Sequence, residues 1–258
     1  MLLARARSLQ ARLLPHGLLD VVRQVLLFAA AYYAYRLVRG WIDDPQGATV
    51  AFSNARHLIH FEQTMGFFVE PSVQAWADTK PAVIDFASWM YLNAQTSVTL
   101  GALAFLYLFH NRSFYFVRNM FLVAFFIALV GYAVLPTAPP RFFPEWGFYD
   151  TVSDFVGVDH DSVAVNSLFN PYAAVPSMHI AFSLMIGVPL ARLCHHRVAR
   201  VAWAMYPLLI LFVIVATGNH FFSDAILGAV TAGIGALVAD RMGHLRPTAW
   251  AFAQVEKA

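Results

Sequence analysis

The feature that most constrains this chain is residues 86–109, a run of 24 residues without a charged side chain. About 20 mostly apolar residues are enough for a helix to cross the hydrocarbon core of a bilayer. Comparable apolar stretches occur at residues 21–38, 119–140, 176–191, 201–219 and 221–239. The sequence therefore predicts an all-α integral membrane protein built as a bundle of six transmembrane helices.

The composition agrees with a membrane protein and argues against several other classes. Apolar residues make up 59% of the 258 residues and charged residues 12%, and the mean hydropathy is +0.58. In a soluble domain, charged residues make up about 25%. A formal net charge of +2 does not indicate a nucleic-acid partner. The only cysteine, Cys194, rules out an internal disulfide, and we expect no metal site. No repeat or linker divides the chain, so residues 1–258 are expected to form one membrane domain.

The distribution of Lys and Arg predicts how the bundle is oriented. Cytoplasmic loops of membrane proteins carry an excess of these residues. With six spans and a cytoplasmic N-terminus, twelve of the 17 Lys and Arg residues fall on the cytoplasmic side, although Arg36 and Arg39 fall outside. Both termini are therefore predicted to be cytoplasmic. Residues 1–17 are predicted to be a basic segment on the cytoplasmic surface and not a signal peptide.

The connection between the first two spans is predicted to contain a further helix. Residues 49–68 carry apolar side chains with mixed helical spacing, and Gly66 could mark the end of the helix. We expect this helix to lie in the interface on the outer side of the membrane. Its polar residues Glu62 and His57 could reach a site at the end of the bundle, but solvation at the surface is the favoured interpretation.

Three polar stretches fall at the outer ends of the predicted spans. They are P-T-A-P-P-R at residues 136–141, P-S-M-H at 176–179 and N-H-F-F-S-D at 219–224. Residues four apart share a helix face, so Asp224 can hold the His220 imidazole and fix its tautomer. Ionisable residues at the end of a membrane span indicate a functional site. Because the three stretches are predicted to lie at the same depth in the membrane, we expect them to form one site on the extracytoplasmic side.

The residue types in these stretches suit phosphoryl transfer. An arginine fork such as that of Arg141 can bind two phosphate oxygens, and an imidazole held by a carboxylate can attack phosphorus and form a covalent intermediate. A second imidazole, as at His179, can protonate the leaving alkoxide and later activate an acceptor. If Ser177 leads into a helix, the free amides of that helix would face the anion. Each residue alone also has a structural interpretation, such as capping a helix or reaching the lipid headgroups.

Polar side chains within the second span indicate a further part of a site. Tyr91 and Asn93 interrupt the apolar run of residues 86–109 and are followed by Gln95 and Thr96. These side chains could line a pocket for a lipid headgroup, or they could form hydrogen bonds between helices. The sequence leaves both interpretations open.

Two of the three polar stretches resemble motifs of a known family. P-S-M-H resembles the P-S-x-H motif of the type-2 phosphatidic acid phosphatase superfamily, and H-F-F-S-D resembles its H-x-x-x-D motif. The resemblance covers residues 136–228, within an expected catalytic core at about residues 119–240. It implies that His220 is the nucleophile, Asp224 its carboxylate partner and His179 the general acid. The two phosphate-binding residues would be Arg141 and Ser177.

Departures from the phosphatase pattern indicate a particular branch of that family. Phosphatase members carry a lysine and a Ser-Arg pair where this chain has Val134 and the apolar residues Val213 and Ile214. The stretches P-T-A-P-P-R, Y-A-A-V-P-S-M-H and T-G-N-H-F-F-S-D are instead similar to the branch that contains inositol phosphorylceramide synthase. Members of that branch move a phosphorylated headgroup from one lipid to another alcohol. A phosphodiester donor carries less charge than a phosphomonoester, so fewer cations would be needed to bind it.

The function that the sequence favours is therefore phosphoryl transfer from a lipid phosphate or phosphodiester through a phosphohistidine, without a metal or other cofactor. With a polyol or a lipid alcohol as acceptor, the protein would be an inositolphosphotransferase-like headgroup transferase. With water as acceptor, it would be a lipid phosphatase acting on phosphatidic acid or on a polyprenyl phosphate or pyrophosphate. A non-enzymatic lipid-binding or lipid-translocating protein is an alternative of another class. The sequence leaves the donor, the acceptor and the oligomeric state open.

Overall fold

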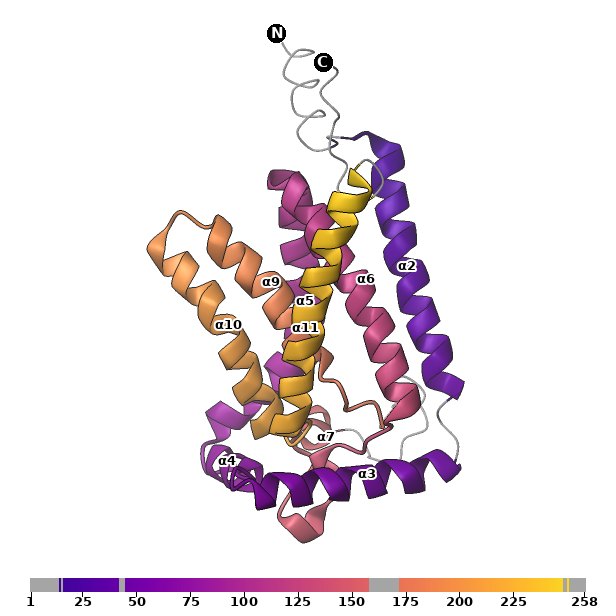
Figure 1. Ribbon diagram of the computed structural model, residues 1–258. Coiled ribbons are helices and arrows are strands. Elements are labelled where there is room, and N and C mark those ends of the chain that lie inside the picture. The colour runs from indigo at the N-terminus through magenta and orange to yellow at the C-terminus, as the bar shows by residue number, and fades with distance from the viewer. Residues whose placement is uncertain (1–13, 15, 42–44, 158–171, 248–249, 251–258) are drawn as a thin grey trace.

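The computed structural model describes residues 14, 16–41, 45–157, 172–247 and 250, and helices make up most of this part of the chain (Figure 1). In chain order the elements are α2 (Leu18–Trp41), α3 (Pro45–Thr64), α4 (Glu70–Asp78), α5 (Pro81–Phe109), α6 (Asn111–Val134), the short 3₁₀ helices η1 (Pro140–Phe142) and η2 (Pro144–Trp146), α7 (Thr151–Val156), α9 (Met178–Leu193), α10 (Arg197–Ala216) and α11 (Phe222–Leu245). Within the described residues there is no strand, and one isolated bridge pairs Thr137 with Ala173. The basic segment predicted at residues 1–17 lies largely outside the described residues.

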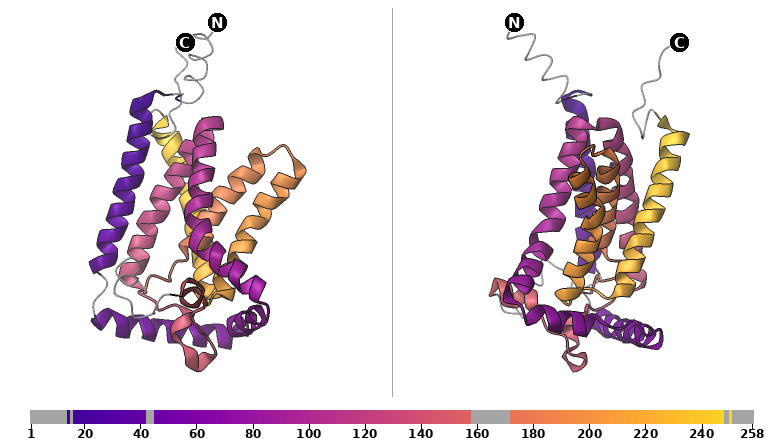
Figure 2. Two further views of the ribbon diagram at one scale, coloured as in Figure 1. Left: turned by 180° about the vertical axis from the view of Figure 1, so that it is seen from behind. Right: turned by 90° about the vertical axis from the view of Figure 1, so that its left-hand side faces the viewer.

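The bundle consists of α2, α5, α6, α9, α10 and α11, which run beside one another (Figures 1 and 2). Among the described residues, four helices are long and apolar enough to cross a membrane, namely α5, α6, α10 and α11. A helix suits this role because it satisfies its own backbone hydrogen bonds where no water is available. The predicted all-α membrane class is therefore confirmed. The count of six spans is not, since α9 has only 16 residues and α2 is not among the helices that qualify.

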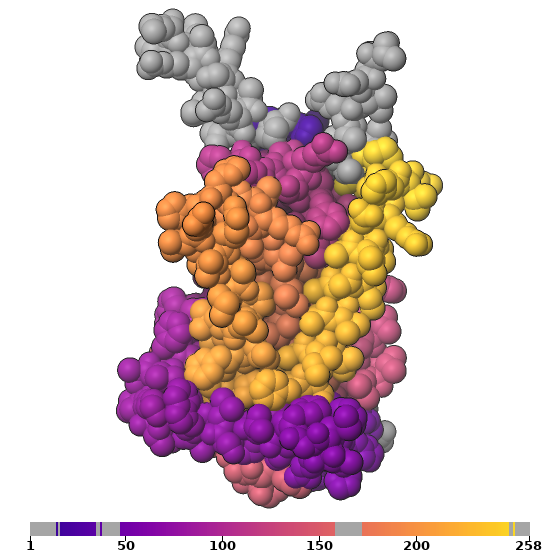
Figure 3. Space-filling view, turned by 60° about the vertical axis from the view of Figure 1, so that its left-hand side comes forward, coloured from indigo at the N-terminus to yellow at the C-terminus, as the bar shows by residue number. Residues whose placement is uncertain are grey.

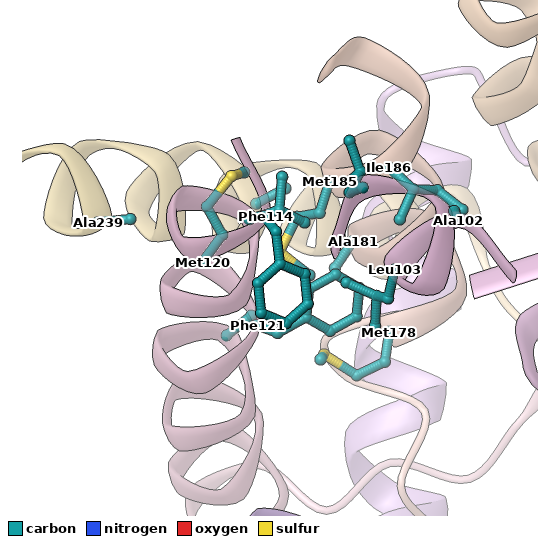
Figure 4. Packing of buried hydrophobic residues seen from close by; sticks show 14 of the residues in the cluster. Ala102, Leu103, Phe114, Met120, Phe121, Met178, Ala181, Met185, Ile186 and Ala239 are labelled. Atoms are coloured by element: carbon teal, nitrogen blue, oxygen red, sulfur yellow. The ribbon is translucent and has the colours of Figure 1, made fainter. Parts of the chain in front are cut away.

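A hydrophobic core fills the space between α5, α6, α9 and α11. Leu103 of α5, Phe121 of α6 and Met178 of α9 are buried in this cluster, and Figure 4 shows their side chains gathered together. On α11, a Cβ added at Gly235 would lie 3.2 Å from the carbonyl oxygen of Met120 on α6. Small residues allow this kind of close approach between membrane helices. Large apolar side chains are exposed on the outward faces of the same helices, where lipid would cover them.

Helix α3 lies across one end of the bundle, at a steep angle to α6 and α11 (Figures 1 and 3). The side chains that it turns toward the bundle are fully buried and recur at helical spacing: Ala51, Ala55, Ile59 and Glu62. The helix predicted at residues 49–68 is therefore present at Pro45–Thr64. Its location in the membrane interface remains a prediction.

The three polar stretches lie together at the end of the bundle that α3 covers. Helix α6 ends there and leads into η1, and α9 begins there. Helix α10 returns to the same end and is joined to α11 by a short turn. The start of α2 and the end of α11 lie at the opposite end (Figure 1). The fold thus brings segments that are far apart in the sequence to one site.

Candidate active site

The turn between α10 and α11 holds His220 and Asp224 beside each other. Gly218 closes α10 with a left-handed φ of +64°, and the His220 amide donates to the Ile214 carbonyl at 3.2 Å. Helix α11 begins directly after this turn, which places Asp224 in its first turn. His220 Nδ1 lies 3.3 Å from Asp224 Oδ2, and the same oxygen accepts the Phe221 amide at 3.0 Å. The carboxylate therefore holds one nitrogen of the imidazole.

Burial sets the protonation state of His220. Its side chain is 7% exposed and that of Asp224 is 0% exposed. Burial lowers the pKa of His220 to about 3; the positive charge of Arg141 acts in the same direction, and a hydrogen bond with the Ala174 backbone opposes it. The imidazole is therefore neutral at neutral pH. With Nδ1–H donated to Asp224, Nε2 carries the lone pair that a nucleophile needs.

Arg141 is anchored to the same turn. It lies in η1, where its backbone amide donates to the Gly218 carbonyl at 2.8 Å. Its guanidinium donates to Asn219 Oδ1, and its Nε lies 3.3 Å from Asp150 Oδ2. These contacts hold the guanidinium close enough for its charge to act on His220.

His179 enters the site from the first turn of α9. The centroid of its ring lies 5.4 Å from that of His220, and Tyr91 of α5 stacks on it at 4.6 Å with an angle of 22° between the ring planes. Asn93, the other polar residue predicted to line a pocket, donates to the Trp89 carbonyl of its own helix at 2.9 Å. The pocket beside His179 is lined by Tyr91 but not by Asn93. The structure therefore brings Tyr91 into the site and leaves Asn93 outside it.

Ser177 precedes α9 and packs against α11. Its backbone amide donates to the Asp224 carbonyl at 3.1 Å, and a Cβ added at Gly228 would overlap the Ser177 carbonyl oxygen. At this separation only glycine fits at position 228. Ser177 is fully buried, and its Oγ has no hydrogen-bond partner among the described residues. A buried hydroxyl without a partner costs free energy, and a bound phosphate oxygen would offset that cost.

Two carboxyl groups that the sequence did not assign to the site lie against the start of α11. Glu62 of α3 and Glu70 of α4 are both fully buried. Glu62 Oε1 accepts the Ser223 amide at 2.8 Å, and Glu70 Oε1 accepts the Phe222 amide at 2.9 Å. The expectation that Glu62 is solvated at the surface is therefore wrong, because α3 turns this side chain toward the bundle.

The sequence also did not reveal Asn219 and Asp150, which hold Arg141. Asn219 acts from a turn, and Asp150 lies in a loop, where it caps α7 by accepting the Ser153 amide at 3.1 Å. Asn219 belongs to the stretch at residues 219–224 that the sequence singled out, but without a role of its own, and Asp150 belongs to no pattern that marks a site. The one usable signal is the scarcity of charge, because a carboxyl group in a bundle with few charged residues needs a specific partner.

A large cavity lies between α2, α5, α6 and α9. Its volume is about 1070 Å³. Most of its lining is apolar, and the residues that form it include Val25, Phe28, Leu103, Phe125, Met178 and Phe182. Because Met178 and Phe182 flank His179 on α9, one end of the cavity lies next to the helix turn that carries this histidine. The cavity therefore offers an apolar space adjoining the polar site.

One comparison shows the family to which the chain belongs, and the match includes all the polar site residues described above. A family model described as the PAP2 superfamily matches residues 56–238, more than half of the chain. The chain belongs to the PAP2 superfamily. The predicted resemblance to type-2 phosphatidic acid phosphatases is thus confirmed at the level of the superfamily, but not for a branch within it. No curated protein and no solved structure matches the chain.

Membership of the PAP2 superfamily, together with the apolar helices, defines the class of protein. It is an integral membrane protein and an enzyme of the phosphatase or phosphotransferase type that acts on lipid phosphates. The match begins within α3 and so includes Glu62, Glu70 and Tyr91, which lie outside the stretch of residues 136–228 that carried the resemblance.

Proposed function

We propose that this PAP2 superfamily member transfers a phosphorylated headgroup from a membrane lipid to a second alcohol, through a phosphohistidine at His220, in a reaction like that of inositol phosphorylceramide synthase. The observation that carries the proposal is the buried pair of His220 and Asp224, 3.3 Å apart, with His179 and Arg141 beside it. Binding an anion needs cations, but it does not need an imidazole oriented by a carboxylate. The arrangement therefore favours catalysis over lipid binding alone.

In the first half of the reaction, His220 attacks phosphorus. Its Nε2 forms a bond to phosphorus while the bond from phosphorus to the leaving oxygen breaks, and His179 gives a proton to that oxygen. Asp224 accepts the hydrogen bond from Nδ1–H and stabilises the positive charge that the imidazole gains. Arg141 and the Ser177 hydroxyl bind the non-bridging phosphate oxygens, together with free amides at the start of α9.

In the second half of the reaction, an acceptor alcohol releases the phosphorylated headgroup. Neutral His179 takes the proton of the acceptor hydroxyl, a new bond from oxygen to phosphorus forms, and the bond from phosphorus to His220 breaks. Both histidines thereby return to their starting protonation states. The stacking of Tyr91 on His179 fixes the plane of the ring that moves this proton. Water as the acceptor would give hydrolysis by the same steps.

The charge of the site favours a phosphodiester donor. Arg141 shares its charge with Asp150. Val213 and Ile214, at the positions where phosphatase members carry a Ser-Arg pair, are apolar and fully buried. A phosphomonoester carries about 1.5 to 2 negative charges at neutral pH, whereas a phosphodiester carries one. A site with few cations therefore suits the diester better.

The cavity between α2, α5, α6 and α9 supports a lipid as donor or acceptor. Its volume of about 1070 Å³ is at the upper end of the roughly 300–1,000 Å³ that is usual for small-molecule sites. Its apolar lining can take up hydrocarbon chains. Because Met178 and Phe182 line the cavity, the headgroup of a lipid bound there would lie close to His179.

A product analysis of the purified wild-type protein and of His220→Ala tests the proposal. Each is incubated in detergent with a mixed phospholipid and polyprenyl-phosphate extract and with inositol as acceptor, then assayed for free phosphate and by lipid mass spectrometry. We expect wild type alone to form a new phosphodiester lipid, without free phosphate and without inhibition by a chelator. The control is His244→Ala, which changes an exposed histidine of the same helix and should match wild type.

The other outcomes select among the alternatives. Free phosphate without a new lipid would make the protein a lipid phosphatase, which is the second candidate because water can discharge the same intermediate. Turnover at the wild-type rate in His220→Ala would overturn the phosphohistidine mechanism. If no donor gave any product, a non-enzymatic lipid-binding role would replace the proposal.

A further inference from the structure

The buried carboxyl groups that the proposed mechanism does not use are Glu62 of α3 and Glu70 of α4. Each accepts one backbone amide at the start of α11, from Ser223 and Phe222 respectively. The preceding amide, that of Phe221, is accepted by Asp224 from within α11. Three consecutive amides that lack a backbone acceptor inside the helix are thus each bound to a side-chain carboxyl group. These amides at the start of α11 are therefore hydrogen-bonded to protein groups and not to substrate.

The second carboxyl oxygens of Glu62 and Glu70 are not hydrogen-bonded to the α11 backbone. Oε2 of each side chain is buried and has no hydrogen-bond donor among the described residues. The two side chains accept adjacent backbone amides, those of Phe222 and Ser223, so their carboxyl groups lie near each other. A carboxyl group that carries a proton can donate a hydrogen bond to a carboxylate beside it. A single proton shared between the two Oε2 atoms would satisfy both. Two unprotonated carboxylates in the same buried place would repel each other.

The electrostatics agree with this arrangement. Burial, helped by a hydrogen bond with Glu70 and by its negative charge, raises the pKa of Glu62 from 4.5 to about 8, against the opposing effect of the hydrogen bonds with Ser223. The ionisable groups that act on the pair are Glu62 and Glu70 themselves and, from α11, Asp224, on which Glu70 acts electrostatically. His220 contacts Asp224 in turn. The pair is therefore linked to the proposed nucleophile through the electrostatic effect of Glu70 on Asp224 and the contact of Asp224 with His220.

We propose that Glu62 and Glu70 are positioning residues that share one proton and clamp the first turn of α11, which keeps Asp224 and His220 in place for catalysis. The catalytic consequence rests on the function proposed above. The pair acts through α11 and does not touch the phosphate. Loss of the shared proton would put two negative charges side by side next to Asp224 and would push α3 and α4 away from α11.

The proposal predicts how activity and stability depend on pH. The native pKa of Glu62 lies above its ordinary value of 4.5, at about 8. Its stabilising contribution is therefore fully present below pH 4.5 and is lost as pH rises through about 8. We expect kcat to fall over the same alkaline range, with little change in KM, because the pair positions the nucleophile and does not bind substrate.

Replacement of Glu62 by glutamine and by alanine distinguishes the effect of the shared proton from the effect of the side chain as a whole. In Glu62→Gln, the carbonyl oxygen still accepts the Ser223 amide and the amide N–H replaces the shared proton toward Glu70. We expect this variant to retain most of the wild-type kcat and to show no fall in kcat at alkaline pH. In Glu62→Ala the clamp is lost at every pH, and kcat should fall by up to about 100-fold, the cost of a displacement near 1 Å. The control is Glu145→Gln, which changes an exposed carboxyl group in η2 and should behave as wild type.

A thermal melt at several pH values gives a readout that does not need activity. We expect the Tm of wild type to fall as pH is raised from about 6 to 9, through the native pKa of Glu62, and the Tm of Glu62→Gln to change less. If no lipid is turned over, this comparison still tests the pair, so failure of the function and failure of the clamp are distinguishable. Equal pH dependence of Tm in wild type and Glu62→Gln would overturn the shared proton. Wild-type kcat in a folded Glu62→Ala would overturn the positioning role.

Discussion

The pair of His220 and Asp224 at the start of α11 has a counterpart near the end of that helix, because Asp240 and His244 are also a His–Asp pair four residues apart. The side chains of the first pair are 7% and 0% exposed, and those of Asp240 and His244 are 63% and 79% exposed. An exposed ion pair contributes little because water and salt screen it. Burial is therefore what allows Asp224 to hold a single tautomer of His220.

We expect Asp224→Asn to lower kcat by about 10⁴-fold, the loss seen when a carboxylate that orients a catalytic histidine becomes an amide. An amide can hold the wrong tautomer and cannot stabilise the positive charge on the imidazole. The measurement is steady-state kinetics with the donor lipid identified by the product analysis. Asp240→Asn is the matched control and should leave kcat unchanged. A loss smaller than tenfold in Asp224→Asn would mean that this carboxylate does not orient the nucleophile.

The pH dependence of kcat/KM tests the state of His220. The nucleophilic form is the deprotonated one, which exists above the pKa, and burial lowers the pKa of His220 from 6.5 to about 3. We therefore expect titration of His220 to cause no loss of kcat/KM as pH is lowered from about 6.5 to 5, since kcat/KM reports on the free enzyme. A tenfold loss for each pH unit below 6.5 would show instead that the imidazole titrates at its ordinary value.

At the scale of elements, the site depends on how closely α9 and α11 pack. His179 reaches His220 because the start of α9 lies against the first turns of α11, with the Ser177 amide donating to the Asp224 carbonyl at 3.1 Å. This approach requires a residue without a Cβ at position 228. The distance between the two histidines is therefore determined by a glycine that has no chemical role of its own.

Gly228→Ala should lower both kcat and Tm, because the added methyl group would overlap the Ser177 carbonyl oxygen and push α9 away from α11. Gly233→Ala is the control on the same helix, since a Cβ there meets nothing within 4 Å. In the control, alanine should raise stability by about 0.5–1 kcal/mol through its better helix propensity. Kinetics and thermal melts of both variants make the comparison. Equal behaviour of the two variants would show that close packing at Gly228 does not position His179.

At the scale of the whole molecule, the remaining prediction is the sidedness of the bundle. The site lies at the end covered by α3, and the hairpin between α9 and α10 projects toward the other end (Figure 1). The excess of Lys and Arg predicts that this other end lies in the cytoplasm. The single cysteine, Cys194, lies in this hairpin and is partly exposed, so it serves as a natural probe of sidedness.

A membrane-impermeant maleimide should label Cys194 only after the cells are opened. In a Cys194→Ser background, Glu145→Cys should be labelled on intact cells, because Glu145 is exposed at the end that carries the site. The extent of labelling before and after permeabilisation is read by gel shift. Labelling of Cys194 on intact cells, with Glu145→Cys protected, would place the catalytic site on the cytoplasmic side and reverse the predicted topology.

The helical membrane class, the superfamily and the main candidate residues could all be predicted from the sequence. Apolar runs of membrane length and the spacing of His220 and Asp224 are properties of short segments, and they hold wherever the rest of the chain lies. The topology then brought His179 and Arg141 to the same end of the bundle. Tyr91 was placed on the correct helix, although whether it lined a headgroup pocket or formed hydrogen bonds between helices could not be decided.

Only the tertiary structure decided how the site is held. Glu62 and Glu70 contact the α11 backbone across 161 and 152 residues of sequence, and Asn219 holds Arg141 across 78. Contacts at such separations depend on how distant elements pack; that of Glu62, for example, depends on which way α3 faces when it lies across the bundle. The residue type alone placed Glu62 at the surface, since a carboxyl group is normally solvated. The partner of Glu62 is a backbone amide, and backbone amides are not distinguished by the residue type in the sequence. Which amides lack an acceptor can be seen only when the start of the helix is located in the structure.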